Sequence, residues 1–81
     1  MNQYVTGAVI KKLREKNNMT QLQLAERLSV SDKTVSKWEN GKGYPDITLL
    51  EPIAEVFRIS VTELISGNTI QNENVDRKSV V

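Results

Sequence analysis

The sequence predicts an all-α domain of five short helices, followed by a polar C-terminal tail. Apolar residues recur at helical spacing through most of the chain, and no segment keeps the alternation of a β-strand for more than a few residues. A Ser or Thr followed three residues later by Gln or Glu, a pattern typical of a helix N-terminus, recurs along the chain. With 81 residues, the chain is long enough for one small domain with its own core.

The first expected helix has an apolar stripe and an identifiable end. Gly7 lies near its start, where a small residue allows a neighbouring element to approach closely. Asn18, in the polar stretch after the stripe, is the candidate for a left-handed residue that ends the helix. The stripe consists of Val5, Val9, Ile10 and Leu13.

The second and third expected helices are separated by a very short turn. The second begins at a capping box formed by Thr20 and Gln23. Only residues 29–31 separate it from the third helix, which Ser31 caps and Gly41 ends. The inward-facing positions are Leu24, Ala25 and Leu28 in the second helix and Val35 and Trp38 in the third.

The fourth and fifth helices also carry start signals. Thr48 with Glu51 predicts a capping box, which makes Pro52 the fourth helical residue, near the limit that a first turn tolerates. A further capping box begins at Ser60 and predicts a short fifth helix that ends at Gly67.

These elements predict one domain over residues 1–67. From residue 68 the chain is polar and has no helical stripe. We therefore expect residues 68–81 to be a flexible tail, or a linker to a further C-terminal domain.

Composition excludes several functional classes. The chain has no cysteine and no histidine, which removes disulfides, thiol chemistry, the usual zinc ligands and the commonest general base. No nucleophile–base pair or phosphate-binding loop is visible either, so we expect neither an enzyme nor a cofactor. No apolar run reaches the length of a membrane span and the N-terminus lacks a signal peptide, which predicts a cytoplasmic protein with no membrane contact.

Charge is unevenly distributed along the chain. Residues 1–44 carry eight Lys or Arg against four Asp or Glu, whereas residues 45–81 carry three against six. A basic half suits a polyanion, and an acidic half suits solvent or a protein partner.

The short turn between the second and third helices predicts a helix-turn-helix over about residues 20–41. It forces a steep crossing and projects the N-terminal half of the helix 31–40 from the body, at a size that fits the major groove. Residues 19–65, which carry "MTQLQLAERLSVS", "SKWENGKGYPD" and "TLLEPIAEVF", resemble the Cro and lambda-repressor type of helix-turn-helix, or XRE family.

The resemblance implies a five-helix lambda-repressor-like fold and sequence-specific binding of a double-stranded DNA operator. It also implies transcriptional control, which we expect to be repression, in a bacterial or phage setting. Such proteins act as homodimers on palindromic sites, and the fifth helix with the segment after Phe57 is our candidate interface. Two residues depart from the family pattern: Ser29 stands where Gly is usual, and Leu22 where a polar residue is usual.

The outward face of the helix 31–40 is expected to read bases. Lysine donates to guanine O6 and N7, and a carboxylate accepts from cytosine N4, so charged residues of both signs suit this role. The predicted base-contacting residues are Asp32, Lys33, Ser36 and Lys37.

A second set is expected to hold phosphates or the scaffold. Gln21 begins the second helix, where free N–H groups bind anions. The resemblance implies that Asn40 and Lys42, which follow the helix, also hold the DNA backbone. Thr34 is expected to contact a phosphate or the methyl group of thymine, and Tyr44 either to add a hydroxyl contact to phosphate or to pack on the loop. The resemblance also implies that Arg14 and Glu39 form a structural ion pair between the first and third helices.

Two alternatives within this fold remain open. The chain could be an antitoxin, with the acidic half as a partner surface, or a protein-interaction module that does not bind DNA. The lysines at 33, 37 and 42 argue against the latter.

Overall fold

The computed structural model describes residues 2–67 and confirms the all-α fold class with five helices. The expected tail, 68–81, lies outside the described residues, so the domain boundary stays a prediction. The helices are α1 (Gln3–Lys16), α2 (Gln21–Leu28), α3 (Asp32–Glu39), α4 (Ile47–Phe57) and α5 (Val61–Ser66).

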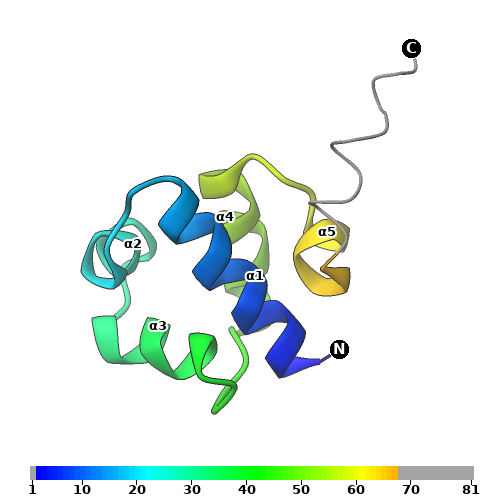
Figure 1. The fold of residues 1–81 in the computed structure, drawn as a ribbon, viewed down its shortest axis with the longest axis horizontal. Coiled ribbons are helices and arrows are strands. Elements are labelled where there is room, and N and C mark those ends of the chain that lie inside the picture. Colours follow the sequence, from blue (N-terminus) through cyan, green and yellow to red (C-terminus); the bar gives the residue numbers. More distant parts are fainter. Residues whose placement is uncertain (1, 68–81) are drawn as a thin grey trace.

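The helices pack around α1. Figure 1 shows α1 crossing the middle of the molecule, with α2 and α3 on one side and α5 on the other. α1 packs against α3 and α5, α2 packs against α3, and α4 packs against α2 and α5. The buried core combines residues of all five helices, among them Ile10, Leu24, Val35, Ile53 and Leu64.

Local capping explains where most helices begin. The Thr20 N–H donates to Gln23 Oε1 (2.8 Å), and the Gln23 N–H donates to the Thr20 hydroxyl (3.0 Å), which completes the predicted capping box of α2. The same reciprocal pair joins Ser60 and Glu63 at the start of α5. Ser31 caps α3 as expected, since its hydroxyl accepts from the Thr34 N–H at 3.2 Å.

The predicted start of α4 is wrong. Asp46 caps this helix, because its carboxylate accepts from both the N–H and the hydroxyl of Thr48. A carboxylate at a helix N-terminus also interacts favourably with the helix dipole, so it prevails over the Thr48 hydroxyl as a cap. Pro52 is therefore the sixth helical residue rather than the fourth. The carbonyl left without a donor belongs to Thr48, which is exposed to solvent.

Left-handed residues end the helices or lie just beyond their ends. Asn18, Gly41 and Gly67 have positive φ, as predicted for these positions, and so does Ser29, which stands where the family usually has Gly. Arg58, with φ of 59°, is left-handed at the end of α4. The sequence does not predict this, because arginine carries no signal for a left-handed conformation.

Candidate nucleic-acid interface

The turn between α2 and α3 sets the crossing of the two helices. Ser29 is left-handed (φ 60°) at the C-cap of α2, and the Val30 N–H returns to the Ala25 carbonyl at 3.0 Å. Ser31 then caps α3 at once. Because the turn is short and is fixed by this hydrogen bond and this cap, α3 is steeply inclined to α2, as in a helix-turn-helix.

α3 divides cleanly into an inward and an outward face. Val35 and Trp38 are buried in the core, whereas Asp32, Lys33 and Lys37 are exposed. Trp38 is therefore a core residue, as the helical spacing predicts.

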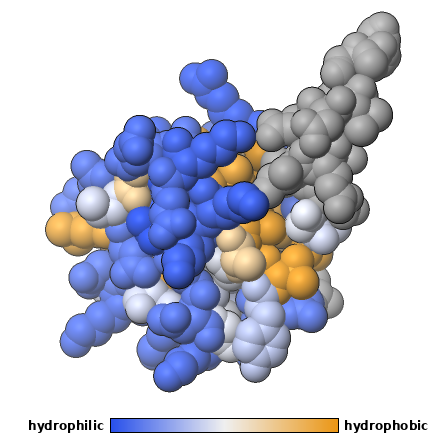
Figure 2. Space-filling view, in the orientation of Figure 1, coloured by the Kyte–Doolittle hydropathy of each residue, from blue (hydrophilic) through white to orange (hydrophobic). Residues whose placement is uncertain are grey.

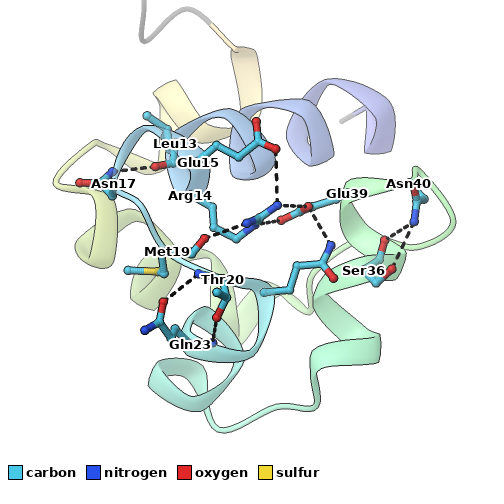
Figure 3. Close-up of polar contacts among 11 residues, drawn as sticks. Leu13, Arg14, Glu15, Asn17, Met19, Thr20, Gln23, Ser36, Glu39 and Asn40 are labelled. Carbon is cyan, nitrogen blue, oxygen red and sulfur yellow. Dashed lines mark hydrogen bonds and ion pairs between the residues drawn. The ribbon is translucent and has the colours of Figure 1, made fainter.

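Ser36 and Asn40 are already joined to each other. The Asn40 amide donates to the Ser36 carbonyl (2.9 Å) and to the Ser36 hydroxyl (3.2 Å), as Figure 3 shows. Ser36 is half-buried and Asn40 is exposed. The bond places the predicted phosphate contact directly beside a predicted base contact at the end of α3.

The other predicted phosphate contacts differ in their surroundings. Thr34 is half-buried, and its hydroxyl lies 2.9 Å from that of Ser31. Lys42 is exposed in the loop after α3. Tyr44 is half-buried in the same loop, and its hydroxyl accepts from the hydroxyl of Thr6 at 3.2 Å.

Arg14 and Glu39 form the ion pair that the resemblance implies. Arg14 Nε donates to Glu39 Oε2 at 2.7 Å and the second contact, to Oε1, is 3.1 Å. The side chains are only 12% and 3% exposed. The hydrogen bond to Glu39 raises the pKa of Arg14, which favours the charged guanidinium.

Two further groups complete this network, and sequence patterns signalled neither of them. Arg14 also donates to the carbonyl of Met19 at 2.7 Å (Figure 3). The amide of Gln21 donates to Glu39 Oε1 at 3.0 Å. The Gln21 side chain, predicted to contact phosphate, thus bonds to the scaffold, while its backbone N–H lies at the start of α2. The network joins α1, α2 and the end of α3 around one buried carboxylate.

The helix-turn-helix family model (HTH_3) matches residues 10–64, which span α2 and α3 together with most of the core. The chain belongs to the helix-turn-helix family. The sequence resemblance to regulators of the XRE type is thereby confirmed.

One relative and one solved structure show what this helix-turn-helix chain is similar to. It is 46% identical over 61 residues to the HTH-type transcriptional activator BcrR of Enterococcus faecalis. The matched segment covers 75% of this chain but only 30% of BcrR. The fold matches the P22 c2 repressor, solved in complex with a synthetic operator, with a TM-score of 0.73 and 26% identity, over 76% of this chain and 94% of that chain.

A third likeness is to part of an enzyme. Hydroxypropylphosphonic acid epoxidase from S. wedmorenis matches with a TM-score of 0.71 and 33% identity, over 78% of this chain and 34% of the epoxidase. The similarity thus concerns one part of that protein, and it does not make this helix-turn-helix chain an enzyme. Within residues 2–67, no helix is long and apolar enough to cross a membrane.

Proposed function

We propose that this chain is the DNA-binding domain of a transcriptional regulator and reads the major groove of double-stranded DNA with α3. The observation that carries the proposal is the exposed face of α3, which presents Lys33 and Lys37 and continues into Lys42 of the next loop. Three lysines on one projecting surface suit a phosphate backbone, and a helix of this size enters the major groove.

The division of labour follows from position. Lys33 and Lys37 read bases together with Asp32 and Ser36, whereas Asn40, Lys42, Tyr44, Thr34 and the N-terminus of α2 at Gln21 hold phosphates. Phosphate contacts fix the register of the protein on the duplex, and base contacts specify the sequence. The buried pair of Arg14 and Glu39 holds α3 to the scaffold and does not itself touch DNA.

We further propose that the chain acts as a homodimer on a palindromic site. Figure 2 shows apolar surface gathered beside α5, and the partly buried residues Val9, Val61 and Ile65 come from α1 and α5. To read both halves of such a site, the dimer must hold two copies of α3 about 34 Å apart, one turn of DNA.

Repression is the proposed outcome of binding. Occupying a site is enough to exclude another protein from it, whereas activation needs an additional contact with the transcription machinery. The proposed place of action is the bacterial or phage-infected cytoplasm, where the operator is accessible.

Selection of bound sequences from a random duplex pool tests the proposal. The 81-residue chain should enrich a palindromic site. Its affinity for that site should fall steeply when salt is raised fourfold, from 50 to 200 mM. For every two phosphates that the bound pair of domains contacts, this fall should be about tenfold or more. A Lys33→Ala/Lys37→Ala variant is the control and should lose the enrichment. Equal, negligible binding to every duplex would refute DNA binding.

A protein-interaction function is the second candidate. The likeness to part of an epoxidase favours it, because there the same fold occurs inside a protein that is named for a different activity. An interaction module of this kind predicts no enrichment of any duplex in the selection experiment and no salt-dependent shift.

A further inference from the structure

We propose that the first turns of α1 position the loop after α3 for phosphate contact, with Gln3 as the principal positioning residue. The inference rests on the proposed DNA-binding function and deepens it. The positioned loop is residues 41–46, between α3 and α4, and it carries Lys42 and Tyr44. None of the α1 residues involved belongs to the helix-turn-helix itself.

A hydrogen bond links Gln3 to the beginning of this loop. The Gln3 amide donates to the Gly41 carbonyl at 2.7 Å, across 38 residues of sequence. Gly41 is left-handed (φ 70°) and immediately precedes Lys42. The bond therefore holds the peptide group from which the backbone of Lys42 departs.

Tyr4 covers the same glycine. A β-carbon at Gly41 would lie 2.3 Å from Tyr4 Cδ1 and 2.5 Å from Cε1, so the edge of the ring rests on the glycine backbone. Tyr4 as a whole is 67% exposed. A residue this exposed contributes little to the core. Its contact with the glycine of the loop gives the aromatic ring a structural role at this position.

A second hydrogen bond secures the other end of the lysine-bearing segment. The hydroxyl of the fully buried Thr6 donates to the hydroxyl of Tyr44 at 3.2 Å. Gln3 and Thr6 thus hold the chain on either side of Lys42, one through Gly41 and one through Tyr44.

The consequence for binding is preorganisation. A lysine on a mobile loop loses conformational freedom when it engages a phosphate, which weakens the contact. A loop held at both ends has lost much of that freedom beforehand. Loss of the Gln3 bond should therefore weaken DNA binding through Lys42 without removing any group that touches DNA.

Gln3→Met is the variant that tests this role. Methionine keeps the length and flexibility of the side chain but cannot donate to Gly41. On the selected site, affinity should fall about three- to tenfold, as for the loss of one hydrogen bond. The slope of log affinity against log salt should become shallower by up to ~0.9 for each DNA-bound domain, the value for one phosphate contact.

Asn17→Ala is the matched control at the opposite end of α1. Its amide also donates one 2.7 Å bond to a backbone carbonyl, but that carbonyl belongs to Leu13 of the same helix. With both variants compared at a temperature where circular dichroism shows them folded, Asn17→Ala should keep the wild-type affinity and salt slope.

A double-mutant cycle with Lys42→Ala identifies the route of the effect. If Gln3 acts through the loop, Gln3→Met should change affinity less than about twofold in the Lys42→Ala background. If Gln3→Met lowers affinity equally in the wild-type and Lys42→Ala backgrounds, the inference is overturned. It is also overturned if Gln3→Met binds with wild-type affinity while Lys42→Ala alone weakens binding. The proposed function survives both of these results, whereas absence of binding by the wild-type chain refutes function and inference together.

Discussion

The backbone of Gly7 in α1 lies directly against the carbonyl of Trp38 in α3. A β-carbon at position 7 would stand 1.9 Å from the Trp38 oxygen and 3.0 Å from its carbonyl carbon. The contact is between backbones, so no side-chain rotation can relieve it. The Trp38 side chain is itself buried in the core. The crossing of α1 over the end of α3 is therefore possible only with glycine at this position, and it helps to set which face of α3 points outward.

Gly7→Ala should destabilise the fold. Overpacking in a well-packed core costs about 1–3 kcal/mol, and this cost should exceed the ~1 kcal/mol by which alanine favours a helix over glycine. The free energy of unfolding from urea titration measures the change. Gly43→Ala is the matched control, because a β-carbon there meets only Lys37 Cβ, at 4.0 Å. Equal stability of the two variants would contradict the close approach.

Arg14→Met should be strongly destabilising, because it leaves the carboxylate of Glu39 buried without its cation. Removal of one partner costs about 3–5 kcal/mol for a fully buried pair, and Glu39 is only 3% exposed. Glu15 gives the comparison: its carboxylate lies 3.8 Å from Arg14 but is 58% exposed. Glu15→Gln should change the unfolding free energy by less than about 0.5 kcal/mol. Similar losses for both variants would argue that burial does not govern the cost.

Local patterns predicted the helices well because capping and helix termination depend on neighbouring residues. The caps at Thr20, Ser31 and Ser60 each involve residues within one turn, and the structure contains all three. The start of α4 was misplaced because two acceptors compete within three residues, Asp46 and Thr48, and the capping-box pattern weighs only one of them.

Long-range contacts explain what sequence reasoning missed at the site. Helical periodicity places Lys33 and Lys37 outward without knowledge of the tertiary fold. The bonds from Gln3 to Gly41 and from Gln21 to Glu39 join residues 38 and 18 positions apart, and no local pattern encodes such pairs. Leu22, which stands where the family usually has a polar residue, is 54% exposed.

Stability should fall in acid partly because Asp46 loses its charge. Hydrogen bonds from the Thr48 hydroxyl and then from the Thr48 N–H lower the pKa of Asp46 below its ordinary value of 3.8. A group with a lowered pKa stabilises the folded state above its unfolded pKa, and that contribution is lost as pH falls through the folded value. Asp46→Asn keeps a neutral cap, so wild type should be the more stable at pH 7. The difference in melting temperature should shrink below pH 3.8. A difference that is the same at pH 7 and pH 3 would exclude this charge as the cause.

Asp32 should increase discrimination between DNA sequences while lowering affinity for DNA in general. It is exposed in the first turn of α3, where the helix dipole favours a carboxylate by about 0.3–1 kcal/mol and where it can accept from cytosine N4. Against phosphates its charge is repulsive, so Asp32→Ala should bind unrelated duplexes more tightly and lose about 1–3 kcal/mol of discrimination at one base pair. Dissociation constants for the selected site, its single-base variants and an unrelated duplex measure both effects. Glu26→Ala on α2 makes the same change in net charge and should leave discrimination intact. If selectivity at every position survives Asp32→Ala, the carboxylate serves only the start of the helix, and Lys33 and Lys37 do the reading.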